Sequence, residues 1–329
     1  MSIFLRRREF IAGLGGAAAW PLVATAQQRA IPVVGWLSGR NSETDANVLP
    51  AFRRGLNRQG YVEGRNVTIE YRWADTQFDR LPALGADLVR RQVAVLVVAG
   101  AGNSYQAVYA ITATIPIVSA TAGGSDFAFR RPGGNVTGVN ALFGDLGGKR
   151  LGLLHDVLPR ATTIAFLTLS ASRQDVQEAA RVLGLQIKVL IAGTDRELDA
   201  ALASLAQMRP DALMVGTGAL FFTRADKIVA AAEQLAIPAI YFRREFALAG
   251  GLMSYGTNTD ENFQVLGEYA GRILKGEKAG DLPIQQPTSF EFVINLKTAK
   301  ALGLTVPPGI RAIACRRGPA ERPCNANST

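Results

Sequence analysis

The feature that most constrains the fold is a regular alternation of short apolar runs and amphipathic helical segments, which begins at Ile31. Most of the runs have the length of strands and are apolar throughout, as expected for strands buried on both faces of a parallel sheet. We therefore predict an α/β fold with helices on both faces of the sheet. The predicted strands of this first series are residues 31–38, 66–74, 93–100, 115–121 and 135–141, and the helices are residues 47–61, 80–92 and 104–114.

The alternation starts again after residue 142. Two such series predict two doubly wound, parallel-sheet lobes with a hinged cleft between them. We expect residues 31–142 plus 258–283 in the N-terminal lobe and residues 143–256 plus 287–304 in the C-terminal lobe. The predicted strands are residues 162–170, 185–192, 210–218, 237–242, 250–256 and 289–296, and the helices are residues 145–159, 173–184, 197–208, 224–236, 259–277 and 297–304.

Residues 6–20, RRREFIAGLGGAAAW, fit two opposed interpretations. Their glycine spacing matches a dinucleotide-binding turn, which would make the protein a cytoplasmic redox enzyme. That turn needs a buried strand before it and an acidic residue about 20 positions later. Three arginines precede the glycines instead, and residues 10–42 contain no Asp or Glu. The dinucleotide interpretation therefore fails.

An export signal accounts for the same segment. Arg7-Arg8-x-Phe10-Ile11 resembles the twin-arginine motif, and a Gly/Ala-rich apolar stretch follows it. Ala24-Thr25-Ala26 has the A-x-A pattern of a cleavage site, with no cysteine nearby for a lipid anchor. We predict a twin-arginine-type signal peptide over residues 1–26, with Sec export as the alternative. The mature protein is then expected to be periplasmic and soluble, and not a lipoprotein.

Composition excludes several classes of function. The formal net charge is +9, but residues 1–26 carry +2 of it and residues 311–329 carry +3. The remaining +4 is spread without a basic run, so we expect no nucleic-acid partner. No apolar run reaches the roughly 18–20 residues that span a bilayer.

The sequence also contains few residues suited to catalysis or to metal binding. Both cysteines, Cys315 and Cys324, lie in the tail, and the single histidine, His155, lies in a predicted helix. The chain has no G-x-S-x-G elbow, P-loop or H-E-x-x-H motif. We therefore predict a protein that is not an enzyme and that carries no cofactor and no metal.

The informative polar residues follow the predicted strands. Ligands of open α/β sheets bind at the carboxyl ends of the strands, and free N–H groups at helix starts suit a carboxylate. Asp126 would take an ammonium group, and aromatic residues would enclose a flat apolar side chain. Each such residue alone could simply cap a helix or shape a turn. As a set, the predicted ligand-binding residues are Ser38, Asn103, Ser104, Thr121, Asp126, Asn140, Ser170, Thr217, Phe221, Phe246 and Tyr255.

The sequence resembles the ABC-transporter substrate-binding proteins related to the tryptophan/tyrosine-binding TrpX type. Residues 237–308 carry the most specific likeness, above all GGLMSYG and ILKGEKAGDLPIQQPTSFEFVINLKTAKALGL. The segments VVGWLSG, FRRGLNRQGYVEGRNVTIEYRWA and RRPGGNVTGV add to it, so that it covers residues 31–308. The resemblance implies a periplasmic-binding-protein type I fold whose hinged cleft closes on a ligand. It also implies partner permease and ATPase subunits at the membrane.

The tail departs from the family pattern. Residues 309–329, GIRAIACRRGPAERPCNANST, are basic, Pro-rich and cysteine-bearing where family members continue into an acidic helix. We expect this atypical tail to be disordered.

Together these features predict a monomeric extracytoplasmic receptor of an ABC importer. Its ligand is expected to be a small molecule, either an amino acid or an aromatic carboxylate. The alternative is a secreted α/β enzyme that acts on a small carboxylate.

Overall fold

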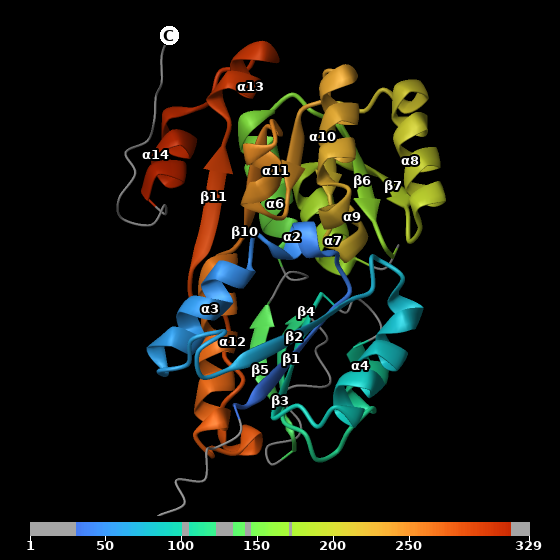
Figure 1. The fold of residues 1–329 in the computed structure, drawn as a ribbon. Coiled ribbons are helices and arrows are strands. Elements are labelled where there is room, and N and C mark those ends of the chain that lie inside the picture. Colours follow the sequence, from blue (N-terminus) through green and yellow to red (C-terminus); the bar gives the residue numbers. More distant parts are fainter. Residues whose placement is uncertain (1–30, 101–104, 123–133, 142–145, 171–172, 317–329) are drawn as a thin grey trace, which may run out of the picture. The chain divides into compact units, whose positions relative to one another are not determined.

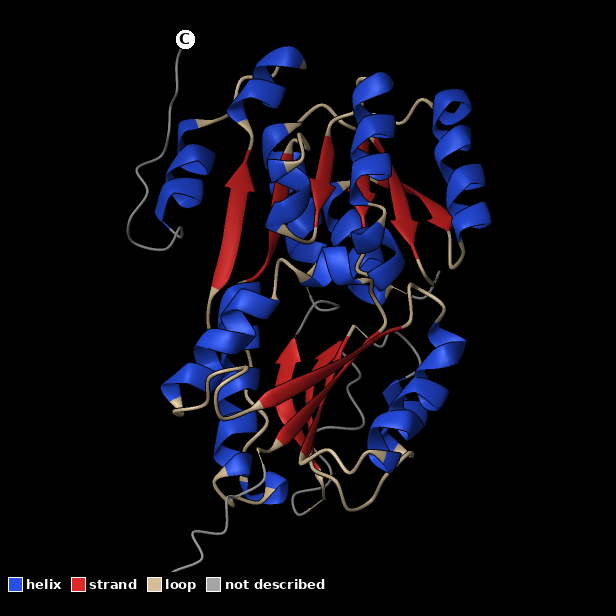
Figure 2. Cartoon of the chain, viewed as in Figure 1, coloured by secondary structure: helices blue, strands red, loops and turns tan. Residues whose placement is uncertain are grey.

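The computed structural model describes residues 31–100, 105–122, 134–141, 146–170 and 173–316. These residues form two β-sheets, each flanked by helices (Figures 1 and 2). The predicted signal peptide lies outside the described ranges. Within them, every helix is too short or too polar to span a bilayer.

The first sheet is parallel throughout, with strand order β2-β1-β3-β4-β5. Side chains of β1 alternate between two hydrophobic cores: Val34 and Trp36 pack in one, and Leu37 packs in the other. Both faces are thus covered, which explains the continuous apolar run in the sequence. The strands are β1 (Val33–Ser38), β2 (Thr68–Trp73), β3 (Val95–Ala99), β4 (Ile117–Ala122) and β5 (Val136–Ala141).

Helices cover the two faces of this sheet. The apolar side of α3, including Phe52, packs in the core with Trp36, and the apolar side of α4, including Leu88, packs in the core with Leu37. Both helices have proline in their first turn, where the missing N–H costs no helical hydrogen bond. The helices that follow the strands of this sheet are α2 (Ser42–Asp45), α3 (Leu49–Arg58), α4 (Leu81–Arg90) and α5 (Tyr105–Tyr109).

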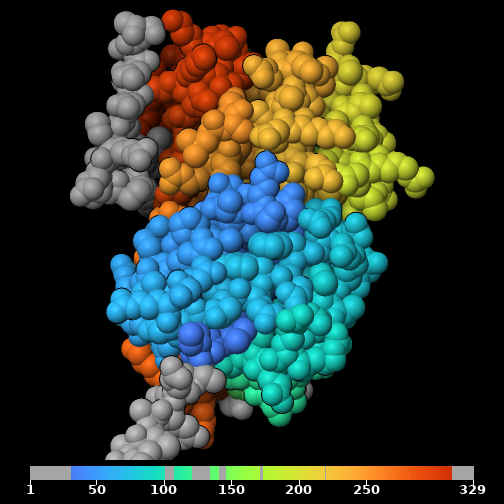
Figure 3. All heavy atoms as spheres, in the orientation of Figure 1, coloured from blue at the N-terminus to red at the C-terminus, as the bar shows by residue number. Residues whose placement is uncertain are grey.

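The second sheet has the strand order β11-β10-β9-β8-β6-β7. Helices α8 and α10 form the surface on one side of it (Figure 3). Its strands are β6 (Thr163–Thr168), β7 (Gln186–Ile191), β8 (Ala212–Val215), β9 (Ala239–Tyr241), β10 (Met253–Thr257) and β11 (Phe290–Ile294). The helices are α6 (Gly147–Val157), α7 (Gln174–Leu183), α8 (Asp195–Met208), α9 (Ala219–Thr223), α10 (Ala225–Gln234), α11 (Arg244–Leu248) and α13 (Leu296–Ala301).

One strand departs from the parallel arrangement, because β11 runs antiparallel to β10. After β10 the chain continues into α12 (Thr259–Leu274), which packs in the core of the first sheet. It then forms a bridge between Gln285 and Val139 of that sheet and re-enters the second sheet beside the end of β10, where Thr257 pairs with Phe290. The chain therefore enters β11 at the end where it left β10, and the two strands must run in opposite directions.

Helix α12 lies unusually close to α3. An added Cβ at Gly267 would lie 2.0 Å from the backbone oxygen of Phe52, and one at Gly55 would lie 2.0 Å from that of Gln264. Glycine is therefore required at both positions for the two backbones to meet. This contact holds a helix from late in the chain against the first sheet (Figure 1).

The prediction of a disordered tail from residue 309 is wrong for its first residues. Helix α14 extends over Pro308–Arg316, and Ile310 is buried in the same core as Val306 and Phe292. The basic, Pro-rich composition suggested disorder, but the apolar side chain of Ile310 packs into this core and anchors α14. Residues 317–329 lie outside the described ranges.

The predicted fold class is confirmed: the chain is an α/β protein with two mainly parallel sheets, each with helices on both faces. The exact lobe boundaries stay a prediction.

Candidate ligand-binding site

Four of the polar residues predicted to bind a ligand, Ser38, Asn140, Ser170 and Thr217, lie at or just after the carboxyl ends of strands. Ser38 ends β1 and is buried, and its Oγ accepts a hydrogen bond from the backbone N–H of Arg40 at 3.1 Å. Asn140 lies near the end of β5 and is also buried. Its side-chain oxygen has no hydrogen-bond partner among the described residues. Ser170 follows β6 and is exposed, whereas Thr217 follows β8 and is half-buried.

Four of the predicted positions cannot be placed as side chains. Asn103, Ser104 and Asp126 lie outside the described residues, as does the side chain of Thr121 in β4.

The three predicted aromatic residues are packed inside the second sheet's cores. Phe221 and Phe246 are fully buried in one core, where the Phe246 ring stacks on Tyr241 with centroids 4.7 Å apart. Tyr255 lies in β10, and the centre of its ring lies 6.2 Å from that of Phe290 and 6.5 Å from that of Phe292. These contacts give all three a packing role, and their contact with a ligand stays a prediction.

A buried arginine that the prediction left out lies two residues after β1. The Arg40 side chain is 5% exposed, and its Nε donates to Oδ1 of Asp45 at 2.6 Å. Its Nη2 is buried and has no hydrogen-bond partner among the described residues. The Asp45 carboxylate also accepts from the indole N–H groups of Trp36, at 2.7 Å, and Trp73, at 3.0 Å. Asp45 thus fixes Arg40 through Nε and leaves one end of the guanidinium free.

A second buried arginine comes from the other sheet. Arg243 follows β9 by two residues, and its Nη2 donates to Oε1 of Glu245 at 2.9 Å. Its guanidinium carbon lies 4.0 Å from the centre of the Phe222 ring, and that of Arg40 lies 5.7 Å from the same ring. We call Arg40, Asp45, Phe222 and Arg243 the arginine cluster.

The charges of the cluster are largely balanced, because Arg40 is paired with Asp45 and Arg243 with Glu245. Burial lowers the pKa of the Arg243 guanidinium, Glu245 partly opposes that shift, and the nearby charge of Arg40 adds to it. The group left for a ligand carboxylate is Nη2 of Arg40, which has no hydrogen-bond partner among the described residues, and a guanidinium fork matches a carboxylate. The Phe222 ring, faced by both cations, is buried in the same core as Phe221 and Phe246. No group of His, Cys, Asp and Glu suited to a metal ion occurs within the described ranges.

The sequence held only weak signals for this cluster. The loops after the first and ninth strands, Ser-Gly-Arg-Asn-Ser and Phe-Arg-Arg-Glu-Phe, contain both arginines. Arginine is mostly exposed, so sequence alone could not distinguish a surface pair from a buried one. Asp45 and Trp36 are near Arg40 in the sequence, whereas Trp73 and Phe222 come from other elements and are brought there by the fold.

Comparison with known proteins identifies the family. The family model described as ABC transporter substrate binding protein matches residues 43–317. A curated relative, the tyrosine-binding protein of Clostridioides difficile (strain R20291), is 25% identical over 264 residues, which are 77% of this chain and 75% of the relative.

Solved structures agree on the fold. A conserved domain protein from Vibrio cholerae has a TM-score of 0.76 at 21% identity, over 86% of this chain and 98% of that one. An ABC domain from Streptococcus pneumonia in complex with L-Trp has a TM-score of 0.74, with the same identity and coverage. The family resemblance inferred from the sequence is therefore confirmed. The chain belongs to the ABC transporter substrate-binding proteins.

Proposed function

We propose that the protein is an extracytoplasmic receptor of an ABC importer and binds an aromatic amino acid or a related small aromatic carboxylate at the arginine cluster. The free Nη2 of Arg40 is the observation that carries this proposal. It is a buried, charged donor at the carboxyl end of a parallel strand, where α/β folds bind their ligands. A ligand carboxylate would satisfy it.

The composition of the cluster supports an aromatic ligand. Phe222 presents its ring to both guanidinium groups, and the centre of the Phe263 ring lies 5.4 Å from the guanidinium carbon of Arg40. The relatives support the same class, because one is named a tyrosine-binding protein and another was solved with L-Trp. The two arginines follow strands of different sheets, so a ligand between them would draw the two lobes together.

We also propose that the receptor delivers its ligand to a membrane transporter. The ligand-bound receptor would dock on a membrane permease driven by an ATPase, as membership of the family suggests. The signal sequence expected over residues 1–26 would place the receptor outside the cytoplasm. The proposed direction of transport is import.

A thermal-shift screen tests the proposed ligand class. Because a ligand that binds only the folded state stabilises it by mass action, L-tryptophan or L-tyrosine at 100 times its Kd should add about 2.7 kcal/mol to the free energy of unfolding. The panel would include the other amino acids, indole-3-propionate and glucose. A panel in which no amino acid and no aromatic acid raises the Tm would contradict the proposal.

Replacing Arg40 by lysine is expected to weaken ligand binding about 10- to 100-fold. Lysine keeps the charge beside Asp45 but loses the planar fork that would hold a carboxylate, which corresponds to about 1.4–3 kcal/mol. Isothermal titration calorimetry measures the change. Arg224→Lys is the matched control, since Arg224 forms a more exposed ion pair with Asp195. Unchanged affinity in both Arg40→Lys and Arg243→Lys would show that the ligand does not meet the cluster.

A further inference from the structure

A cavity lies in the lobe of the second sheet. It has a volume of about 460 Å³ and is formed by the end of α10, the segments that precede β9 and β10, and α13. Residues of β9 also line it, the last of them Tyr241, which precedes Arg243 by two residues. None of the residues of the arginine cluster lines it.

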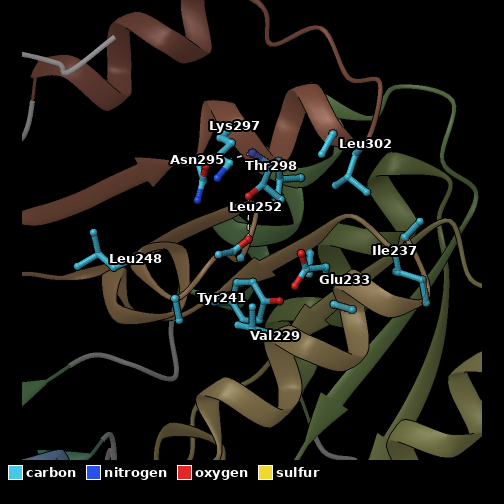
Figure 4. Close-up of a pocket in the computed structure, with 17 residues that line it drawn as sticks. Val229, Glu233, Ile237, Tyr241, Leu248, Leu252, Asn295, Lys297, Thr298 and Leu302 are labelled. Atoms are coloured by element: carbon cyan, nitrogen blue, oxygen red, sulfur yellow. Dashed lines mark hydrogen bonds between the residues drawn. The ribbon is translucent and has the colours of Figure 1, made fainter. Parts of the chain in front are cut away.

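Most of the cavity wall is aliphatic. Figure 4 shows Val229, Ile237, Leu252 and Leu302 around it. Leu248 also lines it and is 69% exposed, an unusual position for a large apolar side chain at the edge of a hollow. A cavity of this size and lining can hold a whole small molecule, such as an amino acid.

The wall contains a buried polar atom, the hydroxyl oxygen of Tyr241. Tyr241 lines the cavity, and its ring is fixed by stacking on Phe246 and by close contact with Gly251. Its hydroxyl oxygen is buried without a hydrogen-bond partner among the described residues. A buried hydroxyl of this kind normally bonds to protein, to water or to a ligand.

Two opposite charges complete the lining. Glu233 comes from α10 and Lys297 from α13, and both side chains are exposed. Neither forms an ion pair or a side-chain hydrogen bond within the described ranges. In Figure 4 the Glu233 carboxylate and the Tyr241 hydroxyl lie toward one side of the cavity, and Lys297 lies toward another.

We propose that this cavity is a second ligand site and that it takes a small zwitterion with an apolar side chain, such as a branched-chain amino acid. Glu233 and the Tyr241 hydroxyl would receive the ammonium group, and Lys297 would receive the carboxylate. The aliphatic wall would cover the side chain. The site is independent of the proposed function at the arginine cluster.

Residue-resolved NMR of the protein tests the site, with L-leucine as the probe. Methyl signals of Val229, Leu252 and Leu302 should shift with saturation. Two matched probes each lack one charge: 4-methylpentanoate lacks the ammonium group and isopentylamine lacks the carboxylate. Each should bind at least tenfold more weakly than L-leucine. Equal binding of either probe would overturn the assignment to a zwitterion.

Two variants separate this site from the arginine cluster. Ala301→Trp places a large ring at an exposed position of the cavity wall and should abolish the shifts, whereas Arg40→Lys should leave them unchanged. Tyr241→Phe keeps the ring and should weaken L-leucine about three- to tenfold. Shifts that survive Ala301→Trp, or that vanish in Arg40→Lys, would overturn the proposal. Because the signals report on each residue, the result does not depend on whether the arginine cluster binds a ligand.

Discussion

Replacing Asp45 by alanine is expected to lower the free energy of unfolding by about 3–5 kcal/mol. The Asp45 side chain is fully buried and accepts from three donors, the Nε of Arg40 and the indole N–H groups of Trp36 and Trp73. Alanine would leave one charge and two N–H groups without their acceptor inside the protein, and an uncompensated buried charge is costly. Urea unfolding followed by circular dichroism measures the loss.

The control for Asp45 is another aspartate of the same lobe. Asp79 is exposed, and Asp79→Ala should change the free energy of unfolding by less than about 0.5 kcal/mol. Asp45→Asn should fall between the two, because the amide keeps an acceptor but loses the charge that balances Arg40. A loss below about 1 kcal/mol in Asp45→Ala would contradict the account of the cluster.

Replacing Gly267 by valine is expected to cost about 3 kcal/mol or more, because the new side chain cannot fit between α12 and α3. Its Cβ would lie 2.0 Å from a backbone oxygen of Phe52, and backbone cannot move aside as a flexible side chain can. The helices would separate, and α12 would lose part of its contact with the core of the first sheet. The free energy of unfolding from urea denaturation measures the effect.

A glycine without close neighbours provides the matched control. Gly152 lies inside α6, and an added Cβ there would meet no heavy atom within 4 Å. Gly152→Ala should therefore stabilise the protein by about 0.5–1 kcal/mol through the higher helix propensity of alanine. If Gly267→Val and Gly152→Ala had similar effects, the close crossing of α3 and α12 would not be important for stability.

Sequence periodicity predicted most of the fold because it reports burial directly. The strand β3 is apolar from Val95 to Ala99 and fully buried, and the helix α12 has its apolar residues at helical spacing. The direction of β11 could not be predicted this way. Its alternating pattern is the same for either direction, and only the passage of the chain through α12 decides it.

The candidate site was predictable in part, for a different physical reason. The topology of parallel sheets places Ser38 and Asn140 at carboxyl ends of strands, so both were within reach of sequence reasoning. Burial of the two arginines was not predictable, since it depends on packing against side chains of other elements, such as Phe222, and not only on the acidic residues nearby in the sequence. Phe221 and Phe222 are neighbours in the chain, yet Phe222 is the one that faces both arginines, because helical geometry turns adjacent side chains about 100° apart.

The most direct test of the ligand site is a crystal structure of the protein with L-tryptophan or L-tyrosine. We predict one ligand at the carboxyl ends of the strands, with a carboxylate oxygen about 3 Å from the Arg40 guanidinium and the ring against Phe222. A ligand bound with neither Arg40 nor Arg243 within hydrogen-bond distance would contradict it.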